Sequence, residues 1–132
     1  MIDSKENTIR FEAPDVTVCP GCSLVDLQKQ WPKKFKEYAP ASFDAGVAVL
    51  NGLRLKVVFF FTGDHLSQVS LSLDASFLQS MSETVAAHDK RLADAFGFEP
   101  SKDATRDYSW GKLSFTSSHK GDSAEITLWF AF

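Results

Sequence analysis

The segment FDAGVAVLNGLRLKVVFFF, residues 43–61, constrains the fold most, because two apolar runs flank the pair Asn51-Gly52. Asn and Gly both tolerate a positive φ, and between apolar runs they predict a β-hairpin with a two-residue turn. Leu50, Val58 and Phe60 are expected on the outer face of this hairpin. The alternation predicts that its core face carries Phe43, Ala45, Val47, Val49, Leu53, Leu55, Val57, Phe59 and Phe61.

A third strand is predicted directly after this hairpin. The residues TGDH, 62–65, form a turn, and in LSQVSLSLD, 66–74, Val69, Leu71 and Leu73 alternate with polar residues. The whole segment therefore predicts a three-stranded antiparallel meander.

A short helix is predicted before the meander. Ser23 and Asp26 form an [ST]-x-x-[DE] capping pattern, and apolar residues at helical spacing follow it. The expected helix spans residues 23–31 and ends or kinks at Pro32, with a resumption through Tyr38 as the alternative.

A long helix is predicted after the meander, over residues 76–96, where apolar residues recur every three, four or seven positions. Its end is marked by Gly97, which suits a left-handed conformation, and by Phe98 and Pro100.

The remaining strands complete an α+β pattern. Residues 8–18 alternate loosely and predict a weak strand that Pro14 splits or moves to an edge, and 107–115 with 124–132 predict a terminal hairpin. We expect a two-layer sandwich in which a mainly antiparallel sheet, a meander plus a C-terminal hairpin, carries one short and one long helix on one face. Residues 1–132 are expected to form a single domain.

Charge and hydropathy argue against two classes of partner. The formal net charge is −3 and no extended basic run occurs, which argues against nucleic acid. No window approaches roughly 18 apolar residues, so no membrane span is expected. The N-terminal residues 1–11 lack a signal-peptide pattern, which predicts a cytoplasmic protein or a mature periplasmic form.

Cys19-Pro20-Gly21-Cys22 precedes the short helix and allows more than one interpretation. An exposed Cys at a helix N-terminus can act as a redox nucleophile, here with Cys19 attacking and Cys22 resolving. A thioredoxin-like fold would need parallel βαβ connectivity, whereas this chain continues into an antiparallel hairpin. We therefore favour a turn whose cysteines are incidental or paired with each other, and keep a redox pair as the alternative.

Other catalytic signatures are absent from the sequence. His65, His88 and His119 lie in separate segments, and one Cys pair falls short of four zinc ligands, so neither a metal nor a cofactor is expected. No paired carboxylates and no glycine-rich phosphate loop occur. The chain is not expected to be an enzyme, and thiol-disulfide chemistry is the one enzymatic alternative.

The outer sheet face supplies the candidate binding residues. Phe60, Trp129, Val58 and Lys56 are expected there, and large apolar side chains among charged ones are typical of a protein interface. The alternative is that Phe60 and Trp129 are covered by the N-terminal segment or by a second copy of the chain. That copy would make the protein a self-associating structural subunit, such as a homodimer.

The runs SLVDLQKQWP and GLRLKVVFFFTGDHLSQVSLSL, with the closing WGKLSF and ITLWF, suggest a family likeness. The pattern over residues 22–132 resembles small bacterial α+β domains of the β-lactamase-inhibitor-like, outer-membrane assembly lipoprotein (BamE-like) and toxin-immunity kind. The resemblance implies a non-catalytic protein binder, such as an inhibitor or immunity protein whose partner is a toxin or an enzyme. It assigns no functional residue.

Overall fold

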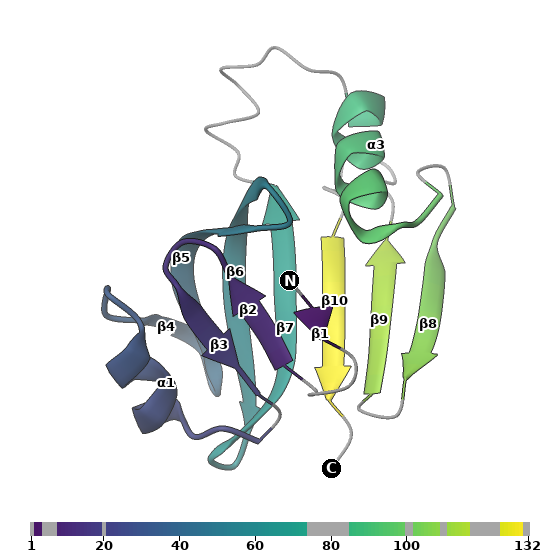
Figure 1. Cartoon of the computed structure of the whole chain (residues 1–132). Helices are drawn as coiled ribbons and strands as arrows, with labels where there is room; N and C mark the ends of the chain where they lie inside the picture. The colour runs from purple at the N-terminus through teal and green to yellow at the C-terminus, as the bar shows by residue number, and fades with distance from the viewer. Residues whose placement is uncertain are drawn as a thin grey trace.

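The computed structural model describes residues 2–3, 8–19, 21–73, 85–99, 102–108, 111–116 and 125–130. Within these residues the chain forms short and long strands and two helices (Figure 1). In chain order the elements are β1 (Ile2–Asp3), β2 (Thr8–Phe11), β3 (Val16–Val18), α1 (Leu24–Gln30), β4 (Lys36–Ala39), β5 (Ser42–Leu50), β6 (Leu53–Thr62), β7 (His65–Leu73), α3 (Val85–Phe96), β8 (Ala104–Tyr108), β9 (Gly111–Thr116) and β10 (Glu125–Phe130).

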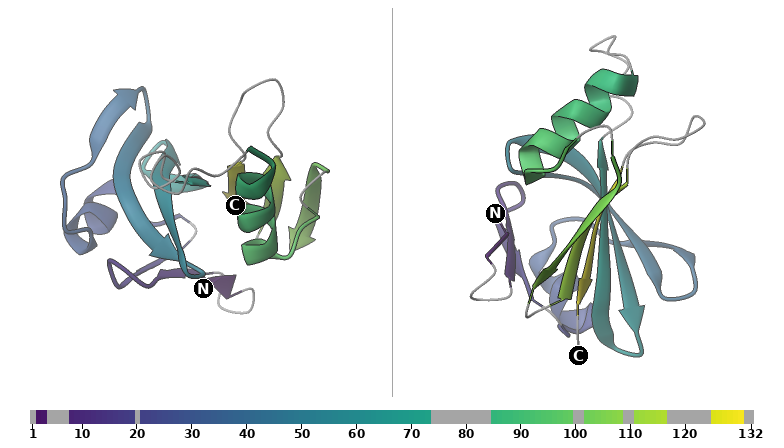
Figure 2. Two further views of the ribbon diagram at one scale, coloured as in Figure 1. Left: turned by 90° about the horizontal axis from the view of Figure 1, so that it is seen from above. Right: turned by 90° about the vertical axis from the view of Figure 1, so that its right-hand side faces the viewer.

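The strands form a large and a small antiparallel sheet, which confirms the predicted α+β class. The large sheet has seven strands in the order β4-β5-β6-β7-β10-β9-β8, and the small sheet has the order β1-β2-β3. The small sheet, α1 and α3 all pack against one face of the large sheet (Figure 2). We call this the inner face, and the opposite one the outer face.

The predicted meander is present as β5, β6 and β7. Asn51 and Gly52 have φ values of 52° and 79°, as the predicted two-residue turn requires, and Leu50 pairs with Leu53 across it. Because β7 then pairs with β10, the meander and the terminal hairpin form one continuous sheet.

A β-bulge in β5 overturns part of the predicted face assignment. The pairing shifts between Asp44 and Gly46, and Asp44 Oδ1 accepts a hydrogen bond from the Gly46 N–H at 2.7 Å. One extra residue reverses the side on which every later side chain lies. Val47 is consequently 38% exposed and pairs with Lys56 on the outer face, whereas Leu50 is fully buried.

The bulge also moves Val49 to the outer face, where it pairs with Arg54 and is half-buried. Val47 and Val49 were predicted for the core and Leu50 for the outer face, so all three assignments are wrong. Strict alternation cannot anticipate a residue that is inserted into one strand only.

Helix α1 forms as predicted, but it does not resume after Pro32. Ser23 is the N-cap, and its Oγ accepts a hydrogen bond from the Asp26 N–H at 3.1 Å. The Gln28 side chain then donates to the Lys33 carbonyl oxygen and accepts from the Phe35 N–H, each at 2.8 Å. These bonds hold the chain in a turn that leads into the strand β4, which replaces the suggested continuation of the helix.

The predicted end of the long helix is confirmed. The Phe98 N–H donates to the Ala93 carbonyl oxygen at 2.8 Å, and the Gly97 N–H donates to the Asp94 carbonyl oxygen at 3.3 Å. Gly97 has a φ of 75°. This is the Schellman arrangement, which Gly favours because it lacks a Cβ. Residues 76–84 of the predicted helix lie outside the described residues. Neither described helix is long and apolar enough to cross a membrane.

The prediction missed three strands, β1, β4 and β8, and β1 has only two residues. β4 was not expected, and β8 lies at the far edge of the large sheet with most of its side chains exposed, so it lacks the apolar alternation that marks a strand. The loosely patterned residues 8–18 do divide near Pro14, into β2 and β3.

Trp31 connects the layers of the core. Its ring meets Phe11 of the small sheet and Phe59 of the large sheet edge-to-face, with centroids 5.4 Å apart in both pairs. Its indole N–H donates to the carbonyl oxygen of Ala45, at the β5 bulge, at 2.9 Å. One side chain therefore joins the C-terminal end of α1 to both sheets and satisfies a backbone group at the irregular position.

We expect Trp31→Phe to lower the free energy of unfolding by about 1–3 kcal/mol, because it leaves the buried carbonyl without this donor. Urea denaturation measures the change. The matched control is Trp129→Phe on the exposed outer face, which should change stability by no more than about 0.5 kcal/mol. Equal losses in the two variants would contradict the role given to Trp31.

Candidate functional site

The structure places all four predicted interface residues on the outer face of the large sheet. Lys56, Val58 and Phe60 alternate along β6, and Trp129 lies on β10. Phe60 pairs with Gln68 of β7, which in turn pairs with Trp129. The two aromatic side chains therefore stand in one row across the sheet, two strand spacings or roughly 10 Å apart.

These four side chains differ in how much of each is exposed. Trp129 is 46% exposed, Lys56 is exposed, and Val58 and Phe60 are half-buried. No described helix or strand packs over them, since α1, α3 and the small sheet all lie on the inner face. The predicted cover by the N-terminal segment is not seen among the described residues, because β2 and β3 pack on the inner side.

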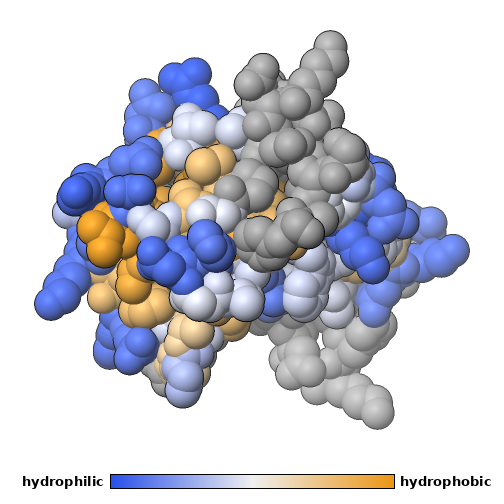
Figure 3. All heavy atoms as spheres, turned by 90° about the horizontal axis from the view of Figure 1, so that it is seen from below, coloured by the Kyte–Doolittle hydropathy of each residue, from blue (hydrophilic) through white to orange (hydrophobic). Residues whose placement is uncertain are grey.

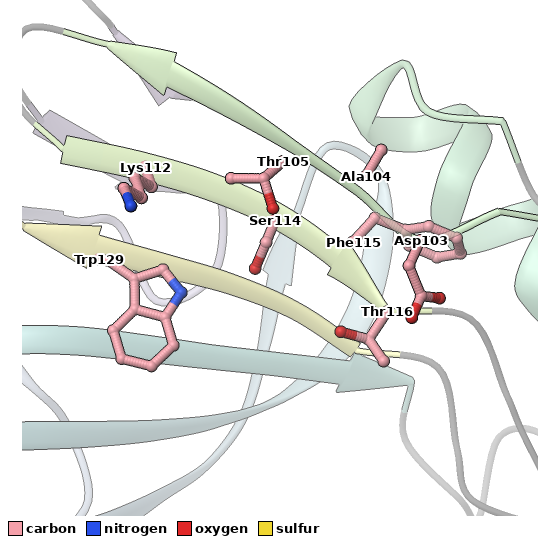
Figure 4. Close-up of a pocket in the computed structure, with 8 residues that line it drawn as sticks. All are labelled: Asp103, Ala104, Thr105, Lys112, Ser114, Phe115, Thr116 and Trp129. Atoms are coloured by element: carbon pink, nitrogen blue, oxygen red, sulfur yellow. The ribbon is translucent and has the colours of Figure 1, made fainter.

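A shallow groove of about 790 Å³ extends from Trp129 across β9 to β8 (Figure 4). Register accounts for its lining, since Trp129 pairs with Lys112, and Thr105 pairs with Ser114. The lining residues are Asp103, Ala104, Thr105, Lys112, Ser114, Phe115, Thr116 and Trp129.

The groove offers an aromatic surface, hydroxyl groups, one amine and one carboxylate. Ser114 and Thr105 carry the hydroxyl groups beside Trp129, and Lys112 and Asp103 carry opposite charges. Hydroxyl, amine and carboxylate groups can form hydrogen bonds with peptide groups, and the indole ring supplies contact area. The mixed charges match a protein surface better than a phosphate backbone.

The sequence pattern did not identify Thr105, Lys112 or Ser114 as site residues. Their positions depend on pairing between β8, β9 and β10, and β8 was not predicted. The only sequence signal for them is that Lys112 and Ser114 alternate with the buried Leu113 and Phe115 in β9.

A second hollow, of about 370 Å³, lies between α1, residues 34–35 and the strand β5. Val25 on its rim is 59% exposed. Figure 3, a view from below, shows hydrophobic side chains among hydrophilic ones on the side where α1 lies. The lining residues are Leu24, Val25, Gln28, Lys29, Lys34, Phe35 and Phe43.

Cys19 and Cys22 are both free thiols at the ends of a tight turn, so they are not paired in this structure. Cys19 is exposed and Cys22 is half-buried against the core. Burial raises the pKa of the Cys22 thiol to about 11 from 9.0, and the neighbouring Cys19 group adds to the shift. Because the thiolate is the reactive form, Cys22 should react slowly with reagents in solution.

The histidines do not assemble a metal or catalytic site in the described part of the chain. His65 Nδ1 lies 3.1 Å from the Gly21 carbonyl oxygen, beside the Cys19–Cys22 turn. The His88 side chain and His119 lie outside the described residues. Among the residues that are described, no group of three His, Cys, Asp or Glu side chains could hold a metal ion.

Comparison with known proteins gives no relative. No protein-family model matches the chain, and no curated protein or solved structure is significantly similar to it.

We expect Cys22 to alkylate slowly in the Cys19→Ser variant, because burial remains after the neighbouring thiol is removed. Burial is the largest cause of the raised pKa of Cys22, and it is retained in this variant, so only a small fraction of the thiol is thiolate at pH 8. The rate with iodoacetamide should then rise about tenfold per pH unit between pH 8 and 10. The control is Cys19 in the Cys22→Ser variant, which should react faster at pH 8. Equal rates would contradict the difference in burial.

Proposed function

We propose that this chain is a non-catalytic protein-binding domain that acts through the outer face of its large sheet. The observation that carries the proposal is Trp129, a large aromatic side chain that is 46% exposed on a face that no described element covers. Tryptophan is enriched among the residues that contribute most to protein–protein affinity.

The surroundings of Trp129 support a binding role. Phe60 shares its row, Val58 lies in the neighbouring row, and the polar groove begins at the Trp129 ring. An apolar centre with polar groups around it is the usual composition of a protein interface. Lys56 lies at the margin of this area, where a charged side chain affects the association rate more than the affinity.

The proposal includes a class of partner and a location. The resemblance to bacterial inhibitor and immunity domains makes a toxin or an enzyme the proposed partner. The proposed location is the cytoplasm.

We expect Trp129→Asp to weaken binding of the partner by about 30-fold or more, since losing such a residue costs about 2 kcal/mol. Phe60→Asp should act in the same direction. Affinity capture from source-cell lysate with quantitative mass spectrometry identifies the partner, and titration with the purified partner then measures the change in Kd.

Val25→Asp is the matched control for these variants, because Val25 is an exposed apolar residue on α1, away from the outer face. It should bind the partner as the wild type does, and far-UV circular dichroism should be unchanged in all three variants. Equal loss in Val25→Asp, or equal binding by every variant, would contradict the proposed face.

The same face could instead bind a second copy of the chain. Sedimentation at several protein concentrations distinguishes this self-association from binding of a different protein. We expect the wild type to remain a monomer over a wide concentration range, because the proposed partner is a different protein. A dimer that forms with rising concentration and is lost in Trp129→Asp would instead assign the outer face to a second copy of the chain.

A further inference from the structure

The Cys19–Cys22 turn has the geometry that a disulfide between its ends requires. The Cys22 N–H donates to the Cys19 carbonyl oxygen at 3.4 Å, and Gly21 has a φ of 74°. The bond from the fourth residue to the first and the positive φ of the third are features of a β-turn, in which the end Cα atoms lie within about 7 Å. Disulfides join Cα atoms that are roughly 4.4–6.8 Å apart, so a bond needs little backbone movement.

The turn lies beside the start of β7 and is hydrogen-bonded to it (Figure 1). The Gly21 N–H donates to the Leu66 carbonyl oxygen at 3.1 Å, and the Leu66 N–H donates to the Cys22 carbonyl oxygen at 3.0 Å. On its other side, Ser23 caps α1. The Cys22 end of the turn is thus held by backbone hydrogen bonds on both sides, which lowers the entropy cost of closing the ring.

The two thiols occupy different environments. Cys19 is exposed to reagents in solution, whereas Cys22 is half-buried and packs against the core. The backbone hydrogen bond from Cys22 to Cys19 closes the turn between them, so both thiols lie at the same end of it. This arrangement suits entry of an oxidant at Cys19 and ring closure by Cys22.

We infer that Cys19 and Cys22 form a reversible disulfide site that accepts oxidising equivalents from low-molecular-weight disulfides such as oxidised glutathione. The Cys19 thiolate attacks one sulfur of the disulfide, forms a mixed disulfide and releases one glutathione thiolate. The Cys22 thiolate then attacks Cys19 Sγ and displaces the second glutathione. Two electrons and two protons pass from the cysteines to the two glutathione molecules.

This site is separate from the proposed binding face. Cys22 lies at the start of α1, and Leu24, two residues later, lines the hollow beside that helix. The outer-face residues around Trp129 do not take part in the turn, so the two proposals can fail independently.

The test incubates the folded protein with glutathione and oxidised glutathione, quenches it with acid and determines the mass. Wild type should lose two hydrogens and carry no glutathione, while Cys22→Ser should gain one glutathione. Cys19→Ser should react at least about tenfold more slowly than Cys22→Ser, because Cys22 is shielded. Cys22→Ala replaces Cys22→Ser if circular dichroism shows that the serine disturbs packing.

Gly21→Ala tests the role of the turn. An alanine at a φ of 74° is strained, so ring closure should slow and the mixed disulfide on Cys19 should accumulate. The matched control is Gly63→Ala, which places the same strain, at a φ of 63°, in the adjacent β6–β7 turn, where a Cβ meets no atom within 4 Å. It should oxidise as the wild type does.

Three outcomes would overturn the inference. They are a wild type that stays fully reduced while Cys22→Ser takes up glutathione, a wild type that keeps glutathione without closing the ring, and disulfide-linked dimers in place of the intrachain bond.

Discussion

Burial of the inner face of the large sheet is the constraint on which the rest of this structure depends. β6, β7 and β10 each present a row of fully buried apolar side chains on that face, and they are covered by the small sheet, α1 and α3. Apolar burial is the main favourable contribution to folding, so this face determines which segments must pack on it. Trp31 joins these layers through ring contacts and a hydrogen bond to the β5 bulge.

The same constraint determines which side chains remain for function. In a strand, alternate residues point to opposite faces, so each buried residue on the inner face leaves its neighbours on the outer face. Phe59 is buried next to Phe60, and Leu128 is buried next to the exposed Trp129. The proposed interface therefore follows from the alternation in β6 and β10, and the register through β7 brings its two aromatic residues into one row.

Local signals in the sequence were sufficient where a short segment carries its own turn or cap. Asn51-Gly52 predicts the hairpin, Ser23 the start of α1, and Gly97-Phe98 the end of α3, and all three are confirmed by backbone angles or hydrogen bonds. The prediction failed for Val47, Val49 and Leu50, because the bulge at Asp44 and Gly46 reverses the alternation in β5. It also missed β1, β4 and β8, which are edge strands and need little apolar alternation to pair.

By itself the sequence determined the α+β class, the antiparallel meander, the helix boundaries with local caps, and the residues Lys56, Val58, Phe60 and Trp129 as outer-face candidates. Only the tertiary structure decided that β7 pairs with β10 and that Lys112, Ser114 and Thr105 extend the face as a groove. It also decided that the start of β7 is hydrogen-bonded to Gly21 and Cys22. The physical reason is the separation in sequence between the interacting residues. Turns and caps depend on neighbouring residues. Strand pairing joins segments that are distant in the chain, and which strands pair depends on burying their shared apolar face.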